Sequence, residues 1–515
     1  MTVVERDNAI SLKRRDRSPC HRSQISLLTG LDIAHESKVP LYRQIYGELK
    51  RLILDGALAP GVMLSSPRAL ADQIKCSRHT VATAYDYLVY EGMLRSEHGV
   101  GTFVSELAAE MVSDRLLRRD GDATAFSMPP LSRFGQRLTE MSSRDETDPL
   151  QLFGASDSSL FPFEIWNRIH SRVWGGGKKR LGMSPLIGGH PDLREAISRL
   201  VQRTRGIQAT PEQILITSGT TQSLDLLMRV LLDPGDKLMV ENPGRPKAAL
   251  LARAQGIELV PVDVDAAGLD VELGTDLACD ARAALVTASH HYPTGATLSL
   301  ERRIQLLSWA SRTGGWIFED DYDGELVAAG QPILPLFSLG RNNRVVYMGT
   351  FSKSIGSHLR IGYIIAHHEI ISAIESARYY IDYFPPLTPQ PVLATFIEGG
   401  HLESHIRRMR KVYSERQYLA KQEITRQAEG LFELSSEAPS LFLPAWLAAA
   451  EPLTDKDIAR LARSAEIPAF DMSSMYLTAA RRQGIVLGTG RMDLKTIPEK
   501  IGLFIRLLNR SRPRR

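Results

Sequence analysis

Hydrophobic and polar positions follow one pattern between residues 39 and 104 and another from about residue 149 onward. The first stretch opens with apolar residues at helical spacing: Leu41, Ile45, Leu49, Leu52 and Ile53. A short helix over 68–75 and a third helix over 78–90 follow, separated by a tight connection at 76–77. Two short runs around residues 98–101 then predict a glycine-tipped hairpin. This order predicts a winged helix-turn-helix, an arrangement that can place its last helix in the major groove of DNA.

The second stretch alternates helical patterns with short apolar runs. These runs are 214–217, 237–240, 283–286, 315–318 and 345–348. The alternation predicts an α/β fold, with βα units around a largely parallel sheet that is covered on both faces. Residues 1–38 are polar and charge-mixed, and we expect a flexible tail. Residues 105–148 are rich in Ser, Asp, Arg, Met and Pro, and we expect a linker between domains at 39–104 and 149–515.

Composition narrows the class of protein. The chain has 515 residues, of which 43% are hydrophobic and 24% charged, and this balance excludes a largely disordered protein. Its net charge of +4 is too small to indicate nucleic-acid binding by itself. Cys20, Cys76 and Cys279 are too few and too scattered for a disulfide framework or a cysteine zinc site, so we expect free thiols. No apolar run reaches the ~18 residues of a membrane span, and the charged residues 5–7 argue against a signal peptide. We expect a cytoplasmic protein.

The first module carries a specific motif. The run LSSPRALADQIKCSRHTVATAYDYLVYEG from Leu64, continued by SEHGVGTFV to Val104, resembles the winged helix-turn-helix of the GntR family of bacterial transcription regulators. The resemblance implies contacts to double-stranded operator DNA from seven residues: Arg68, Ser77, Arg78, His79, Thr80, His98 and Gly99. Arginine suits guanine edges or phosphates, and hydroxyls at a helix start suit phosphate oxygens. The module has seven basic and six acidic residues, so ordinary solvated helix charges stay an alternative for its arginines.

In the second module, four clusters of polar residues stand at or near the ends of predicted strands. They are TSGTTQ from Thr217, HHYPTG from His290, WIFEDDYD from Trp316 and GTFSKSIGSHLRIGY from Gly349. Amides and hydroxyls at the helix start in the first cluster can bind phosphate, although many αβ turns look similar. A single lysine or aspartate is more often a surface residue or a helix cap. Four clusters in this order indicate one shared site.

Together the clusters resemble the fold-type I, pyridoxal-phosphate-dependent aminotransferases over nearly all of residues 152–508. The resemblance implies that Lys353 forms a Schiff base with the aldehyde of pyridoxal 5′-phosphate (PLP). It also implies that Asp320 keeps the pyridine nitrogen protonated and that Tyr322 bonds the ring oxygen. The implied phosphate-binding residues are Ser352, Arg360, Thr220 and Thr221.

Joined in one chain, the two modules resemble the MocR/GabR-type subfamily of GntR regulators, whose aminotransferase-like domain senses a ligand. The segment HLESHIRRMRKVY from His401 resembles the transition to that subfamily's small C-terminal subdomain, which we expect from about residue 400. The resemblance implies a homodimer that regulates transcription. Its effector would be a small amine or amino-acid-like molecule, or PLP itself.

Several departures weaken a catalytic interpretation more than a cofactor-binding one. Arg245 stands in the PGRP turn, where the subfamily usually carries an aromatic residue against the cofactor ring, and Tyr292 stands where enzymes carry an asparagine. Residues 183–189 lack the tyrosine that aminotransferases extend to the partner subunit's phosphate. No arginine clearly matches the anchor of a substrate carboxylate, although Arg482 and Arg491 are nearby.

We therefore expect a cofactor-binding regulator without sustained turnover, with Arg245 and Tyr292 facing the cofactor. Two alternatives stay open. One is a working aminotransferase that carries a DNA-binding module, and the other is a regulator that has lost PLP.

Overall fold

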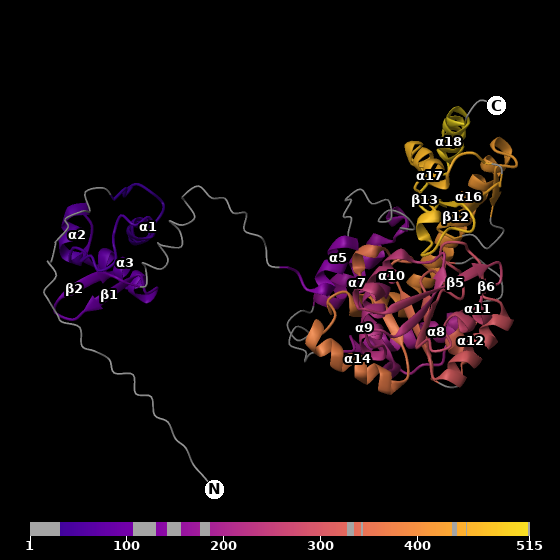
Figure 1. Cartoon of the computed structure of the whole chain (residues 1–515), viewed down its shortest axis with the longest axis horizontal. Helices are drawn as coiled ribbons and strands as arrows, with labels where there is room; N and C mark the ends of the chain where they lie inside the picture. Colours follow the sequence, from indigo (N-terminus) through magenta and orange to yellow (C-terminus); the bar gives the residue numbers. More distant parts are fainter. Residues whose placement is uncertain are drawn as a thin grey trace, which may run out of the picture. The chain divides into compact units, whose positions relative to one another are not determined.

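The structure, a computed structural model, describes residues 31–106, 130–141, 156–175, 186–326, 334–340, 343–434, 440–449 and 451–512. Its contacts divide the chain into two compact units, Met1–Pro130 and Leu131–Arg515 (Figure 1). Most of the predicted tail, most of the predicted linker and Cys20 lie outside the described residues. Cys76 and Cys279 are free thiols. Within the described ranges, no helix combines the length and the apolar character that crossing a membrane requires.

The N-terminal unit consists of three helices and a hairpin. They are α1 (Leu41–Leu54), α2 (Pro67–Ile74), α3 (Arg78–Tyr90), β1 (Leu94–Glu97) and β2 (Gly101–Val104). Serine caps begin two of the helices, because Ser66 Oγ accepts the Ala69 amide at 3.2 Å and Ser77 Oγ accepts the Thr80 amide at 3.1 Å. Lys75 turns the chain between α2 and α3 with a left-handed φ of 54°. These elements confirm the predicted helix-turn-helix and wing.

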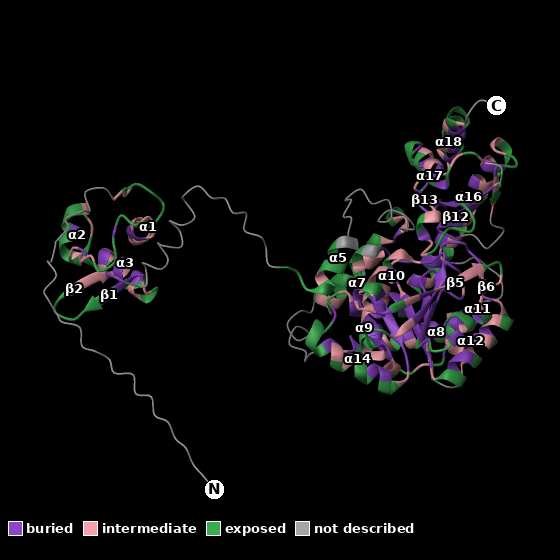
Figure 2. Cartoon of the chain, in the orientation of Figure 1, coloured by how far each residue is buried: buried purple, intermediate pink, exposed green. Residues whose placement is uncertain are grey.

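One apolar core holds this unit together. The fully buried residues of the helices are Ile45, Leu49, Ile53, Leu70, Val81, Ala84 and Leu88. Tyr85 is also buried, and its hydroxyl donates to the Ser65 carbonyl at 2.9 Å, which satisfies a polar group inside the core. The buried face of α3 is thus fixed by packing. Its opposite face stays exposed, as the green segments of Figure 2 indicate.

An eight-stranded sheet forms the centre of the second unit, in the order β3-β10-β9-β8-β7-β4-β5-β6 (Figure 1). Its strands are β3 (Ile214–Thr217), β4 (Lys237–Asn242), β5 (Glu258–Asp265), β6 (Gly268–Leu269), β7 (Ala283–Val286), β8 (Trp316–Asp321), β9 (Val345–Thr350) and β10 (Gly362–Ile365). The neighbours from β5 through β4, β7 and β8 to β9 are parallel, as predicted.

The sequence did not predict that β10 runs antiparallel to both β9 and β3, and that β6 runs antiparallel to β5. Parallel neighbours need a long crossover, usually a helix. Between β9 and β10 the chain forms only the short 3-10 turn η4 (Ser357–Leu359), so β10 returns in the opposite direction.

Helices cover both faces of this sheet, whose strands are buried (Figure 2). Successive side chains of a strand point to opposite faces. Val346 and Met348 share a core with α9 (Thr220–Leu231), α10 (Pro246–Ala254) and α14 (His368–Ile381). The opposite face, with Val345 and Tyr347, packs against α8 (Pro191–Arg205), α11 (Val271–Leu277), α12 (Leu300–Thr313) and α15 (Gln390–Glu398). The other elements of this part of the unit are α7 (Phe163–Gly175), α13 (Leu336–Leu339), η1 (Ser158–Leu160) and η3 (Pro211–Gln213).

A smaller subdomain follows the long helix α16 (His401–Gln427). Its antiparallel sheet has the order β11-β12-β14-β13, with β11 (Phe432–Leu434), β12 (Phe442–Leu447), β13 (Ala469–Asp471) and β14 (Gly484–Gly488). Its other elements are α17 (Asp455–Ser464), η5 (Ser473–Met475) and α18 (Ile497–Ser511). The apolar faces of α16, α17 and α18 share one core with this sheet.

Part of the predicted linker is a helix of the second unit. This helix, α5 (Arg133–Met141), packs against α10, and Arg137 donates from Nη1 to the Arg253 carbonyl at 3.3 Å.

Candidate cofactor site and DNA-reading surface

The predicted cofactor residues gather at one edge of the large sheet. Strands β3, β4, β7, β8 and β9 run in the same direction, so their carboxyl ends share this edge. Asp320 lies near the end of β8, Lys353 follows β9, Arg245 follows β4, Tyr292 follows β7, and Thr220 begins the helix after β3. Ligands of α/β sheets bind at this kind of edge. The fold therefore brings together residues that are more than 130 positions apart in the sequence.

Lys353 lies in a turn held by backbone hydrogen bonds. The Phe351 amide donates to the Ile361 carbonyl at 3.0 Å, and the Ile355 amide donates to the Phe351 carbonyl at 2.8 Å. Burial, together with the positive charge of Arg245, lowers the pKa of the Lys353 ammonium to about 8. An amine with this pKa is partly neutral near pH 7, and the neutral form is the nucleophile.

Asp320 and Arg245 form an ion pair between Oδ2 and Nη1. Asp320 is 4% exposed, and its Oδ1 has no hydrogen-bond partner among the described residues. A buried acceptor without a donor costs stability, so the open Oδ1 indicates a position for a donor that the described residues do not supply. The side chain of Arg245 is 29% exposed, and its Cζ lies 6.0 Å from the centre of the Tyr322 ring. Arg245 thus lies inside the site, in direct contact with Asp320.

Aromatic rings and one histidine form the wall beside Asp320. The Tyr322 hydroxyl lies 3.1 Å from His290 Nδ1, and the same nitrogen lies 2.8 Å from Asp323 Oδ2. Burial raises the pKa of Tyr322 well above its usual value, so the phenol stays protonated. The Tyr292 ring meets the Tyr322 ring edge-on at 6.0 Å, and Phe442 of the small subdomain stacks on His290 at 5.2 Å. The small subdomain therefore closes one side of the site.

The first turn of α9 provides a position for phosphate. Gly219 caps this helix with φ 110°, a conformation that favours glycine, and the amides of Thr220 and Thr221 lack carbonyl partners within the helix. Arg360 lies against this cap, since a Cβ on Gly219 would come 3.2 Å from Arg360 Nη2. A helix start beside a guanidinium is a suitable site for an anion.

Ser352 is hydrogen-bonded to Thr350, the last residue of β9. The Thr350 hydroxyl donates to Ser352 Oγ at 3.1 Å, and the Ser352 amide donates to Thr350 Oγ1 at 3.2 Å. The side chain of Ser352 is half-buried, two residues beyond the end of β9.

The sequence analysis missed a buried ion pair beneath the site. Arg205, the last residue of α8, pairs with Asp321. The Tyr347 hydroxyl donates to the same carboxylate oxygen at 2.5 Å. Asp321 stood out as an acid at a strand end, whereas Arg205 gave no signal because 116 positions separate the partners. The pair fixes the end of β8, directly after Asp320.

The two arginines considered as carboxylate anchors have different surroundings. Arg482 makes a cation–π contact, because its Cζ lies 4.9 Å from the centre of the Trp446 ring. Arg491 is exposed and makes no ion pair with any described residue. The preceding Gly490 amide donates to the Leu441 carbonyl at 3.0 Å, one residue before the phenylalanine that stacks on His290.

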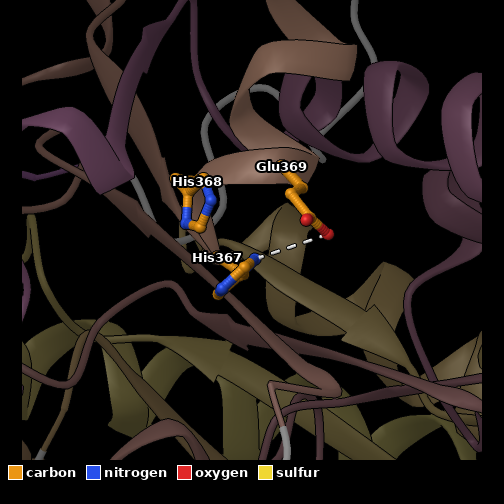
Figure 3. A group of neighbouring side chains, drawn as sticks. All are labelled: His367, His368 and Glu369. Carbon is orange, nitrogen blue, oxygen red and sulfur yellow. Dashed lines mark ion pairs between the residues drawn. The ribbon is translucent and has the colours of Figure 1, made fainter.

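A separate group of potential metal ligands lies at the start of α14 (Figure 3). His367, His368 and Glu369 have ligand atoms within 4.8 Å of one another, and His367 Nδ1 lies 3.9 Å from Glu369 Oε2. His368 and Glu369 are exposed. Among the described residues, no hydrogen bond orients the imidazole of His367 or that of His368. Metal sites depend on such supporting bonds, so we assign no role to this group.

The predicted DNA contacts lie on the surface of the N-terminal unit. Six are exposed and Thr80 is half-buried; the exposed residues are Arg68, Ser77, Arg78, His79, His98 and Gly99. The Thr80 and Ser77 hydroxyls lie 2.7 Å apart at the start of α3. Neither Arg68 nor Arg78 makes an ion pair within the described part of the chain. Gly99 has a φ of 75° at the tip of the hairpin, a conformation that suits glycine.

Both units match known families. Residues 41–104 match the gntR family of bacterial regulatory proteins, and residues 176–463 match aminotransferase class I and II. An archaeal alanine:glyoxylate aminotransferase aligns with 26% identity and a TM-score of 0.64, over 74% of this chain and 96% of its own. Kynurenine aminotransferase of Pyrococcus horikoshii, solved with PMP, aligns with 24% identity and a TM-score of 0.65, over 77% and 99%. Fold and site thus define a PLP-dependent aminotransferase-like unit joined to a winged helix-turn-helix.

Relatives that cover most of this chain are transcription regulators. The probable rhizopine catabolism regulatory protein MocR of Rhizobium meliloti is 33% identical over 92% of this chain and 94% of its own length. TauR of Rhodobacter capsulatus is 35% identical over 70% and 75%, and the pyridoxine biosynthesis regulator PdxR of Corynebacterium glutamicum is 30% identical over 76% and 80%. The chain belongs to the MocR-type subfamily of GntR regulators, which carry an aminotransferase-like domain. It is a DNA-binding transcription regulator, and its cofactor is PLP.

Proposed function

We propose that this regulator binds a small amine or amino-acid-like effector at the PLP site and changes its affinity for operator DNA in response. The observation that supports this most is the convergence of Lys353, Asp320 and the start of α9 on one edge of the sheet, in a chain that also exposes the DNA-reading helix α3. A sensor requires only that the effector binds two conformations with different affinity. Turnover further requires groups that hold the reacting bond in position.

The residues at this edge fit PLP. The open Oδ1 of Asp320 would accept a hydrogen bond from the ring nitrogen, and the protonated hydroxyl of Tyr322 would donate to the ring oxygen. Lys353 would hold the aldehyde carbon covalently. The phosphate would lie between the start of α9 and the guanidinium next to it, held by Thr220, Thr221, Ser352 and Arg360. Arg245 and Tyr292 would lie beside the ring.

When bound, PLP supplies an aldehyde to which amines attach reversibly and a ring that withdraws electrons. An effector with a primary amine would compete with Lys353 for the same carbon. The lowered pKa of Lys353 favours this exchange, because the released lysine stays partly neutral. Arg491 is an exposed arginine near this side of the site, and it could hold an anionic group of the effector.

A homodimer in the cytoplasm is part of this proposal. An exposed patch of large apolar side chains lies at the end of α14 and just beyond it: Tyr379, Tyr380, Ile381, Tyr383 and Phe384, which are 37% to 86% exposed. Such a patch is typical of a surface that a partner covers. A second copy would cover it and would supply a second winged unit for a paired half-site.

Polar contacts connect the patch to the expected phosphate position at the start of α9. Arg378 is fully buried and pairs with Asp382, which accepts a hydrogen bond from Gln222 Nε2 at 2.7 Å. Gln222 lies in the first turn of α9, two residues after Thr220. A dimer contact at the patch would therefore adjoin the cofactor site.

The experiment that tests this function measures operator affinity at a fixed salt concentration. Full-length protein is loaded with PLP and titrated with labelled operator DNA, in the presence and absence of a panel of primary amines and amino acids. We expect one class of amine to change both the visible spectrum and the DNA affinity, and neither change should occur with the Lys353→Ala variant. A spectrum that responds to amines while DNA affinity stays constant would contradict the sensor.

A further inference from the structure

Arg245 and Asp320 make the cofactor site of this chain unusual. The carboxylate of Asp320 has two oxygens: Oδ2 pairs with the Arg245 guanidinium, while Oδ1 is buried without a partner among the described residues. A carboxylate can accept hydrogen bonds at both oxygens at once. Arg245 therefore occupies one of the two oxygens of the carboxylate that would hold the ring nitrogen of PLP, and Oδ1 is left for that nitrogen.

The backbone is constrained at both Asp320 and Arg245. The Asp320 position pairs with Met348 in the parallel register of β8 and β9. Arg245 follows Gly244, whose amide donates to the Met475 carbonyl at 3.1 Å. A Cβ on Gly244 would come 2.2 Å from the Glu241 carbonyl oxygen, so only glycine fits there without a shift. Because both backbones are constrained, the ion pair is a consequence of the fold.

A second cation on a shared carboxylate changes what that carboxylate does. A nearby negative charge favours the protonated form of a base, and a nearby positive charge disfavours it. With Arg245 at Oδ2, the ring nitrogen at Oδ1 would receive less net negative charge from Asp320 and would face a cation in addition. The electron-withdrawing strength of the ring depends on that proton.

We propose that Arg245 is a positioning residue that shares Asp320 with the ring nitrogen of PLP, keeps that nitrogen less basic and so restrains catalysis in favour of ligand binding. This inference rests on the proposed function, since it concerns PLP bound at Lys353. It explains why a site that has the lysine, the aspartate and the phosphate position of an aminotransferase would bind a ligand in a sensor and not sustain catalysis. It also assigns a role to the residue in which the PGRP turn departs from the subfamily.

Other charged or titratable groups surround this pair and affect the same proton. Glu241 is buried below the turn, and both the amide and the hydroxyl of Thr287 donate to its carboxyl group. Burial raises the pKa of Glu241 to about 7. Further titratable groups near this pair include the cations Lys353 and Lys247, and also Asp323, His290, His291, Tyr292 and Tyr322. Asp320 Oδ1 has no hydrogen-bond partner among the described residues, and Arg245 pairs directly with the other oxygen of this carboxylate.

The test uses PLP labelled with ¹⁵N at the ring nitrogen, bound to the full-length protein. The ¹⁵N chemical shift reports directly whether this nitrogen carries a proton. We compare wild type with Arg245→Gln, which removes the charge, Arg245→Phe, which places an aromatic ring there, and Arg245→Lys, which keeps the charge. We expect the midpoint of nitrogen protonation to rise by one pH unit or more in the Gln and Phe variants and to stay near wild type in the Lys variant.

A second readout is the single-turnover rate with an amine that the wild type recognises, which we expect to rise about tenfold or more in Arg245→Phe. An unchanged ¹⁵N midpoint in both uncharged variants would overturn the inference, even if the wild type binds PLP and responds to amines. Loss of PLP binding by folded Arg245→Gln and Arg245→Phe would also overturn it, since Arg245 would then be required to hold the cofactor. If the wild type itself binds no PLP, the proposed function fails and this inference fails with it.

Discussion

His405 Nε2 lies 2.9 Å from the carbonyl oxygen of Ser354, the residue directly after Lys353. His405 lies on α16, the helix that leads into the small subdomain, and Ser354 lies in the lysine turn. Burial lowers the pKa of His405 to about 4, and the charge of Arg408 adds to this effect, so the imidazole is neutral at pH 7 and donates through Nε2–H. The bond joins the lysine turn to the element that carries the small subdomain.

Replacing His405 should therefore loosen the lysine turn. In His405→Leu, the buried Ser354 carbonyl loses its donor, and we expect stability to fall by about 1–3 kcal/mol. PLP affinity should fall as well, because the turn that carries Lys353 is no longer fixed. His405→Gln, which can donate from a similar position, serves as the matched control and should recover most of the PLP affinity in an absorbance titration. Equal PLP affinity in wild type and His405→Leu would contradict this role.

The same histidine predicts a pH dependence of stability. Its pKa is lowered in the folded state, so the unfolded chain binds a proton more tightly between the two pKa values. The stability that His405 contributes is thus fully present above pH 6.5 and is lost as the pH falls toward about 4. Urea unfolding between pH 4 and 7 should show a smaller acid loss for His405→Gln than for wild type. An identical acid loss in both proteins would rule out His405 as its source.

Loading of PLP onto Lys353 should also depend on pH. With a pKa of about 8, roughly one tenth of this amine is neutral at pH 7, far more than for an ordinary lysine. We expect the rate at which the visible band forms to rise with pH and to level off above about 8. The midpoint should move upward in Arg245→Gln, because the charge of Arg245 helps to lower this pKa. Lys353→Ala should show no band and no borohydride trapping while it stays folded.

Operator binding should depend on Arg68 and Arg78. Alanine at an arginine that reads a base should cost about 1–3 kcal/mol and relax specificity, whereas loss of a phosphate contact should weaken all sequences alike and flatten the salt dependence. Arg51 is a matched control, because this exposed arginine of α1 pairs with Glu48 of its own helix. The measurement is fluorescence anisotropy with operator and non-operator DNA at several salt concentrations. Normal binding by the double variant would refute the assignment of these contacts.

A charged residue in the aromatic patch should weaken self-association. Tyr380 is 86% exposed, so Tyr380→Asp should leave the subunit folded and lower the dimer fraction in light scattering at micromolar concentration. Tyr418 of α16 is also exposed, at 64%, and Tyr418→Asp is the control. A variant that stays fully dimeric would place the interface elsewhere.

Sustained amino-group transfer should be absent from the wild type. The test incubates PLP-saturated protein with amino acids, amines and 2-oxo acids and follows product over time. Spectral change without accumulating product is the expected result. Multiple turnovers near the ~10 s⁻¹ typical of enzymes would instead favour an aminotransferase that carries a DNA-binding module.

The sequence by itself determined the elements whose signals are local. The helix predicted over 78–90 has those bounds in the structure, because an N-cap serine and an apolar periodicity lie within one short segment. The glycine-tipped wing and the parallel strands β4, β7, β8 and β9 were predicted for the same reason, whereas β5 was not among the predicted runs. The resemblance to two families likewise depends on short runs of residues, which include Lys353 and Asp320.

Only the tertiary structure decided which of these residues meet. Arg245 pairs with Asp320 because β7 alone separates β4 from β8 in the sheet, and the strand order is a property of the whole fold. Arg360 lies against Gly219 because β10 returns antiparallel beside β3, a direction that no local pattern indicated. Periodicity and capping act over a few residues, whereas these contacts join positions that are 75 and 141 residues apart in the chain. Packing of the complete sheet and its helices therefore sets the chemistry of the site.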